Sequence, residues 1–125
     1  MARKSLPRPT EAELGILRVL WRRGPSTVRQ VTGELGAETG YTTALKLLQI
    51  MTEKGLVVRD DSERTHVFAP AIPEEATQRQ LLEDLLERAF GGSAQKLVLQ
   101  ALAGRRPSPA ELAELRRLLD SLEGH

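Results

Sequence analysis

The sequence predicts a mainly α-helical protein with one small β-hairpin, and three observations support that fold class. Apolar residues recur at helical spacing along most of the 125 residues. Several of these segments begin with residues that cap a helix start, or end at a glycine. One stretch between them holds two β-prone runs separated by turn formers. Because 40% of the residues are apolar and only 3% are aromatic, we expect an aliphatic core.

The first predicted helix begins at a capping box. In Thr10-Glu11-Ala12-Glu13, the Thr10 hydroxyl and the Glu13 carboxylate can each accept a hydrogen bond from a free backbone N–H group. A helical stripe of apolar residues follows, made of Leu14, Leu17, Leu20 and Trp21. The stripe stops before Gly24-Pro25, where the helix should end.

Two further short helices follow with tight joints. Ser26 or Thr27 can cap the second helix, which should end at Gly36. Its apolar residues are Val28, Val31 and Leu35. After a loop, the third helix runs from about Thr42 to Lys54 and closes at Gly55, where a C-terminal glycine belongs.

A hairpin comes next. Leu56–Arg59 and Arg64–Ala69 are β-prone, and the turn formers Asp60–Glu63 separate them. An isolated hairpin is barely stable, so it must pack on the helices. Helix, helix, helix, hairpin is the order of a winged helix-turn-helix, which we place at residues 1–72.

The sequence of residues 73–125 predicts a region of three helices. We expect helices over about Glu74–Phe90 and Ser93–Ala103, and a last helix that starts with the capping box Ser108–Glu111. Its apolar faces exceed what one thin helical layer needs, which favours a dimerisation region. The residues concerned are Leu82, Leu85, Leu86, Phe90, Leu112, Leu115, Leu119 and Leu122. The alternative is that these helices fold back on the winged unit as one monomeric core.

Composition argues against several classes of protein. The chain has no cysteine, and its only imidazoles are His66 and His125. We therefore expect no metal site, no cofactor and no enzyme activity, since no nucleophile–base pair or phosphate loop is present. No apolar run approaches the roughly 20 residues that cross a bilayer, and the start resembles no signal peptide, so we expect a cytoplasmic protein.

The third helix has two contrasting faces. Placing successive residues 100° apart puts one apolar and one polar set on opposite sides. The apolar set is Ala44, Leu47, Leu48 and Met51, and the polar set is Thr42, Lys46, Gln49 and Glu53. Gln can pair with adenine, Thr can contact a base or phosphate, and Lys can reach guanine or phosphate. The predicted base-reading residues are Thr42, Thr43, Lys46 and Gln49.

The same face could simply be solvated, as on any amphipathic helix. Basic residues on the same unit favour DNA: Arg59 and Arg64 flank the hairpin turn, and Arg3, Lys4 and Arg8 precede the first helix. The acidic residues at the hairpin tip would repel phosphates. We interpret His66 as a strand residue rather than a metal ligand or catalytic base.

The chain resembles the BlaI/MecI/CopY family of bacterial repressors, also called penicillinase repressors. The resemblance rests on TEAELGILRVLWRRGPSTVRQV, on YTTALKLLQIMTEKGLV and on VVRDDSERTHVFAP, and it covers essentially the whole chain. It implies a homodimeric winged-helix repressor that binds a palindromic double-stranded operator. It also implies derepression when a membrane sensor metalloprotease triggers cleavage in the helical region.

Matched by position, Tyr41, Thr42 and Thr43 begin the family's recognition helix, and the scissile bond would lie near Gln100-Ala101. Many members carry Arg where this chain has Ile50. The copper-responsive branch uses C-terminal cysteines, so this chain should not sense copper. The competing hypothesis is a winged-helix protein–protein interaction module without sequence-specific DNA binding.

Overall fold

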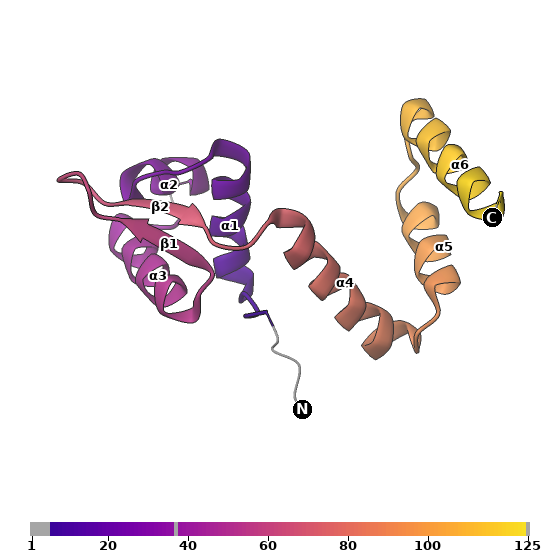
Figure 1. Ribbon diagram of the computed structural model, residues 1–125, viewed down its shortest axis with the longest axis horizontal. Helices are drawn as coiled ribbons and strands as arrows, with labels where there is room; N and C mark the ends of the chain where they lie inside the picture. Colours follow the sequence, from indigo (N-terminus) through magenta and orange to yellow (C-terminus); the bar gives the residue numbers. More distant parts are fainter. Residues whose placement is uncertain (1–5, 37, 125) are drawn as a thin grey trace. The chain divides into compact units, whose positions relative to one another are not determined.

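The computed structural model describes residues 6–36 and 38–124, and these residues form six helices and one two-stranded antiparallel sheet (Figure 1). The elements are α1 (Glu11–Arg23), α2 (Val28–Leu35), α3 (Tyr41–Lys54), β1 (Val57–Asp60), β2 (Val67–Pro70), α4 (Glu74–Phe90), α5 (Ala94–Gly104) and α6 (Pro109–Glu123). This order confirms the predicted fold class, a winged helix-turn-helix followed by helices. The chain divides into two compact units, which meet between Leu81 and Leu82.

The starts of the first two helices follow the predicted capping chemistry. At α1 the Thr10 backbone N–H donates to Glu13 Oε1 over 2.8 Å, and the Glu13 N–H donates to Thr10 Oγ1 over 3.2 Å. This reciprocal pair confirms the capping box. At α2 the cap is Thr27, with Gln30 as its reciprocal partner, so of the two candidate caps the second holds the helix.

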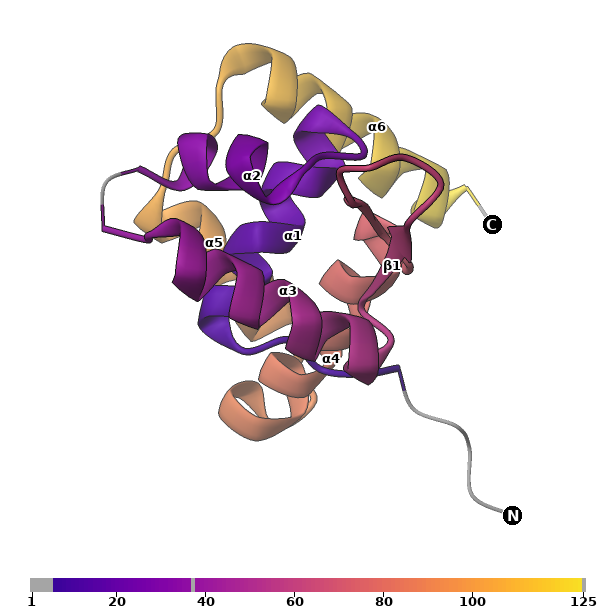
Figure 2. The same ribbon diagram turned by 90° about the vertical axis from the view of Figure 1, so that its left-hand side faces the viewer.

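The core of the first unit lies between α1, α2, α3 and the hairpin. In Figure 2, α3 crosses the front of this unit, with α2 above it and the hairpin to one side. The apolar side chains that are buried there are Ile16, Leu17, Val19, Leu20, Val28, Val31, Ala44, Leu48, Met51, Leu56, Val57 and Phe68. Apart from Phe68 this set is aliphatic, as the low aromatic content predicted. Leu14 and Trp21, assigned to the α1 stripe, are only partly buried.

The hairpin strands are shorter than the β-prone runs. Val57 pairs with Pro70 and Asp60 with Val67, which leaves residues 61–66 as an extended tip. The Asp60 carboxylate accepts the Ser62 N–H over 2.9 Å and turns the chain directly after β1. Since residues 61–66 carry no large aliphatic side chain to bury, the predicted second run, which began at Arg64, enters the sheet only at Val67. The tip projects beyond the helices in Figure 1.

A short bridge ties the hairpin to the joint between α1 and α2. The backbone of Ser26 exchanges two hydrogen bonds with Phe68, of 2.9 and 2.8 Å, as in an antiparallel sheet. Both residues are buried. The start of α2 therefore lies beside β2, and the wing is fixed to the helical part.

The first turns of α4 belong to the winged unit. Trp21 Nε1 donates to the Ile72 carbonyl over 3.1 Å, and Gln80 Nε2 donates to the Leu6 carbonyl over 2.7 Å. Thr77 is buried although it is polar. The compact winged unit thus runs into α4, beyond the boundary at residue 72 that the sequence suggested for the DNA-binding region.

The second unit contains the rest of α4 with α5 and α6. Ser93 caps α5, and a capping box between Ser108 and Glu111 starts α6, with Pro109 at its first position. None of the described residues from Leu82 to Gly124 is buried. Searched over the described residues, the helices include none with the length and apolar character needed to cross a bilayer.

Candidate nucleic-acid interface

The outward face of α3 is polar at its start and centre, as predicted. Ala44, Leu48 and Met51 are fully buried, and Leu47 is partly buried, so these residues fix the orientation of the helix. The side chains left exposed on α3 include Tyr41, Thr42, Thr43, Lys46, Gln49, Ile50 and Glu53. The structure therefore brings every predicted base-reading residue to one accessible surface. Ile50, 38% exposed, is an apolar residue on that surface.

The C-terminal end of α3 is held by an ion pair. Lys54 Nζ lies 2.6 Å from Glu13 Oε1, and the Glu13 side chain is only 3% exposed. Burial raises the pKa of the Glu13 carboxyl, but the hydrogen bond and charge of Lys54, with the Thr10 hydrogen bonds, outweigh it, so the pKa lies below its ordinary value. The helix then ends at Gly55, which has left-handed backbone. The ion pair thereby joins the start of α1 to the end of α3.

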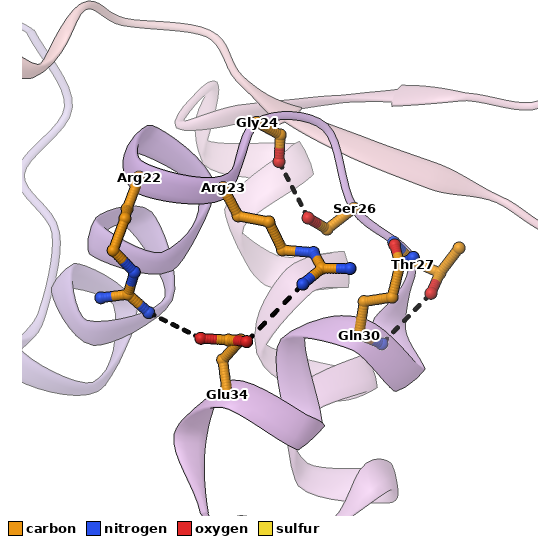
Figure 3. Close-up of polar contacts among 7 residues, drawn as sticks. All are labelled: Arg22, Arg23, Gly24, Ser26, Thr27, Gln30 and Glu34. Carbon is orange, nitrogen blue, oxygen red and sulfur yellow. Dashed lines mark hydrogen bonds and ion pairs between the residues drawn. The ribbon is translucent and has the colours of Figure 1, made fainter.

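The start of α2 is fixed by the joint before it, drawn in Figure 3. The Ser26 hydroxyl donates to the Gly24 carbonyl over 2.8 Å, and the Gln30 N–H donates to Thr27 Oγ1 over 3.2 Å. Glu34 of α2 also accepts a charged hydrogen bond from Arg22 of α1 over 2.9 Å. These contacts fix the start of α2 and hold α2 against the end of α1.

The two arginines of the wing differ in whether they form an ion pair. Arg59 Nε lies 2.8 Å from Asp61 Oδ1, so this predicted phosphate contact is already paired within the hairpin. His66 Nε2 lies 3.5 Å from the same oxygen. The hydrogen bond from the Ser62 N–H lowers the pKa of Asp60. Arg64, in contrast, forms no ion pair within the part of the chain that the structure describes.

A hollow of about 340 Å³ lies between the start of α2, the start of α3 and the wing. Among its lining residues are Thr27, Arg29, Tyr41, Arg64, Thr65 and His66. The Arg29 guanidinium stands over the Tyr41 ring, 5.9 Å from its centroid. Sequence reasoning missed Arg29, because its proximity to Tyr41 and Arg64 depends on how the α2–α3 loop and the wing fold. A basic residue two positions after a helix cap was the one local signal.

The remaining predicted site residues lie before α1 or in α5. Arg3 and Lys4 lie outside the described residues. Arg8 is exposed, just before α1. Gln100 and Ala101, the candidate cleavage pair, are exposed within α5.

The predicted dimerisation residues lie on α4 and α6. Four of them are partly buried, namely Leu86, Phe90, Leu112 and Leu115. Four are exposed, namely Leu82, Leu85, Leu119 and Leu122. The prediction overlooked further exposed apolar side chains, among them Val98, Leu99, Leu102 and Leu118. Helical spacing could have signalled these residues of α5 and α6 as well.

Comparison with known proteins gives consistent matches. The penicillinase repressor family matches residues 9–121. Over 124 residues the chain is 33% identical to the transcriptional regulator BlaI of Mycobacterium tuberculosis, spanning 96% of this chain and 89% of that protein. The penicillinase repressor of Bacillus licheniformis is 25% identical over 119 residues, spanning 94% of this chain and 93% of that protein.

One similar solved structure contains DNA. It is the monomeric form of Bacillus licheniformis BlaI in complex with the blaP half-operator. The similarity has a TM-score of 0.50 at 25% sequence identity, and it covers 58% of this chain and 92% of that one.

Proposed function

The chain belongs to the penicillinase repressor family, and from this premise we propose that it is a transcriptional repressor that binds a palindromic DNA operator as a homodimer. The observation that carries the proposal is the outward face of α3, which is polar and accessible, on a helix whose C-terminal end is fixed to α1 by the Lys54–Glu13 ion pair. The family is one of repressors rather than enzymes. We place the repressor in the cytoplasm, where its operator would be accessible.

In the proposed complex α3 lies in the major groove and reads bases chiefly through its first turns. Gln49 pairs with adenine through its amide, and Thr42 and Thr43 contact bases or phosphates near the helix start. Lys46 reaches a guanine or a phosphate. That a family relative with a similar winged unit has been solved on a half-operator supports this orientation.

Dimerisation through residues 73–125 would bury apolar surface that the single chain leaves in water. No described residue of the second unit is buried. Its most exposed leucines include Leu82, Leu85, Leu119 and Leu122, each at least 49% exposed. Covering such side chains contributes about 25 cal/mol per Å² of apolar surface. Residues 1–72 would then bind DNA while the tail joins two copies, so two recognition helices meet two half-sites about one helical turn apart, or a multiple of it.

We propose that proteolysis relieves repression through the same arrangement. Cleavage near Gln100-Ala101 would separate α6, with Leu112, Leu115 and Leu119, from the DNA-binding unit. A protease needs extended backbone, and α5 has no buried residue that would resist unwinding. We propose a membrane sensor metalloprotease as the trigger. Loss of the dimer would weaken operator binding, since the second half-site contact is intramolecular only while the subunits are joined.

Comparing a full dyad with one of its halves tests the proposal. The operator is first located by footprinting the DNA upstream of the protein's own gene. We expect the intact protein to bind the dyad about a hundredfold or more tightly than a duplex carrying one half-site and a scrambled second half. Equal affinity for the two duplexes would refute the dimeric repressor. Failure to prefer either over random DNA would favour the protein-interaction module instead.

A further inference from the structure

The hollow between α2, α3 and the wing has an apolar floor and polar walls. Val28 and Phe68, which line it, are buried, with exposures of 6% and 1%. The walls carry the guanidinium groups of Arg29 and Arg64 and the hydroxyl of Thr65. Three elements that are far apart in sequence contribute to it. A cavity with two cations and neutral hydroxyl donors suits a small anion.

The two cations of the hollow differ from several others on the winged unit, which are paired with carboxylates. Arg22 and Arg59 each pair with a carboxylate at 2.9 and 2.8 Å. Arg29 and Arg64 have no carboxylate partner in the described ranges 6–36 and 38–124. The Asp61 carboxylate contacts the lining residue His66, and its charge is already offset by Arg59. The hollow therefore has uncompensated positive charge.

The Arg29 side chain is also oriented. Its guanidinium stands over the ring of Tyr41, with 5.9 Å between the Cζ atom and the ring centroid. A guanidinium held over a ring in this way can still donate hydrogen bonds from its N–H groups. Tyr41 is the first residue of α3, so the edge of the hollow adjoins the outward face of that helix.

We propose that this hollow is a phosphate seat, in which Arg29 and Arg64 together hold one backbone phosphodiester of the bound DNA beside α3. The inference rests on the proposed repressor function. It specifies the position of the protein along the duplex. Guanidinium groups match the tetrahedral oxyanion with paired, charge-assisted hydrogen bonds. Such a contact fixes where the recognition helix sits without reading any base. In this seat Arg29 helps to position α3 on the duplex.

Single-site neutralisation of the DNA backbone tests the seat directly. Full-length wild type, Arg29→Gln, Arg64→Gln and the double variant are titrated on the operator. Each single change should weaken binding about tenfold, as expected for a charge-assisted hydrogen bond. Because both side chains hold one phosphate, the second change should cost less than about threefold on the background of the first. Replacing that one phosphate by a neutral methylphosphonate should remove the effect of both variants.

Arg18→Gln is the matched control, since Arg18 is exposed on α1, carries the same charge and does not line the hollow. Its effect should be no larger than threefold and should not depend on any single phosphate. If Arg29→Gln and Arg64→Gln behave like this control, or if their effects multiply on every duplex, the seat is refuted while the repressor function stands. If wild type itself does not prefer the operator, the repressor function has failed.

A second arm separates backbone phosphate from free phosphate. Inorganic phosphate is added to the protein without DNA, and the arginine side-chain Nε–Hε NMR signals are followed. Weak binding, far from saturation at about 10 mM phosphate, is expected for a seat that needs the rest of the duplex. Saturation at micromolar phosphate, together with operator binding that both variants leave intact, would assign the hollow to a free phosphate ester and overturn the DNA assignment.

Discussion

Gln49 is the residue for which base reading makes the most specific prediction. Its amide is exposed near the middle of α3, where it can donate to and accept from one adenine. Gln49→Ala should cost about 1–3 kcal/mol on the natural operator and relax the preference at one base pair. Competition against operators mutated one pair at a time measures this. An equal loss on every sequence would show that Gln49 does not read a base.

Glu13 couples a helix cap to the far end of the recognition helix. Its carboxylate accepts from the Thr10 N–H and from Lys54, which is 41 positions away in the chain. Glu13→Gln should therefore lower the free energy of unfolding at neutral pH by about 1–3 kcal/mol, the range for hydrogen bonds to a charged group. Glu11→Gln, exposed in the same helical turn, is the control and should cost well under 1 kcal/mol.

The same ion pair predicts how stability depends on pH. Because the native pKa of Glu13 is lowered from 4.5, the folded protein binds this proton less tightly than the unfolded chain. The stabilisation is complete above pH 4.5 and is lost as the pH falls through the native value. Denaturant melts at several pH values between about 6 and 3 should show a smaller loss for Glu13→Gln than for wild type. Identical pH slopes in the two proteins would contradict this account.

For single residues, the sequence predicted those positions and contacts that depend on local spacing. The capping box at Thr10 follows from the Thr-x-x-Glu motif, and the outward position of Gln49 follows from helical periodicity. The partners of Glu13 and Arg29 could not be predicted in the same way. Lys54 reaches Glu13, and Tyr41 reaches Arg29, only after the helices have packed, and no local pattern encodes these pairs.

Among the elements, α3 ends where its glycine permits a left-handed turn. Gly55 has φ 85° and ψ 15°, and a Cβ built there would meet no atom within 4 Å. Gly55→Ala should therefore destabilise the protein by about 1–2 kcal/mol through backbone conformation alone.

Gly33, inside α2, provides the matched control for Gly55. A Cβ there also meets no atom within 4 Å, but its backbone is helical. Gly33→Ala should stabilise the protein by about 0.5–1 kcal/mol. Thermal unfolding of the two variants should thus shift in opposite directions. Shifts of the same sign would contradict the backbone explanation.

Element boundaries were predictable where a cap or a glycine marks them. The range Glu74–Phe90 was predicted correctly, and α3 begins one residue earlier than expected. The hairpin was less predictable, because strand ends depend on pairing across the sheet. Arg64 is in a β-prone run, yet it lies in the tip because the register pairs Asp60 with Val67.

For the whole molecule, the apolar tail predicts a dimer that single substitutions can dissociate. Leu115→Asp should give a monomer by sedimentation velocity at concentrations where wild type is dimeric. Leu115 also lines a groove between α5 and α6, so Leu119→Asp is the cleaner variant. Leu119 is 59% exposed, and a charge there costs the single chain little. Dimers that persist in both variants, with unchanged circular dichroism, would remove α6 from the interface.

The compact units of the structure do not divide the chain where the sequence patterns suggested. Sequence patterns separated a winged unit from a helical tail and suggested a boundary at residue 72. The compact units meet nine residues later, within α4. The contact between Gln80 and Leu6 joins residues 74 positions apart, so it leaves no trace in local periodicity. The proposed functional division, in which the tail dimerises, remains a prediction.

The most direct test of the repressor proposal is a fluorescence-anisotropy titration of the intact protein. One labelled duplex carries the DNA upstream of its own gene, and the other is a scrambled duplex of the same composition, each at two salt concentrations. We predict a preference of at least about a thousandfold for the upstream DNA. We also predict that log K falls by about 0.9 for each phosphate contact per decade of salt. Equal and weak binding to both duplexes would contradict sequence-specific repression and leave the winged unit as a protein-interaction module.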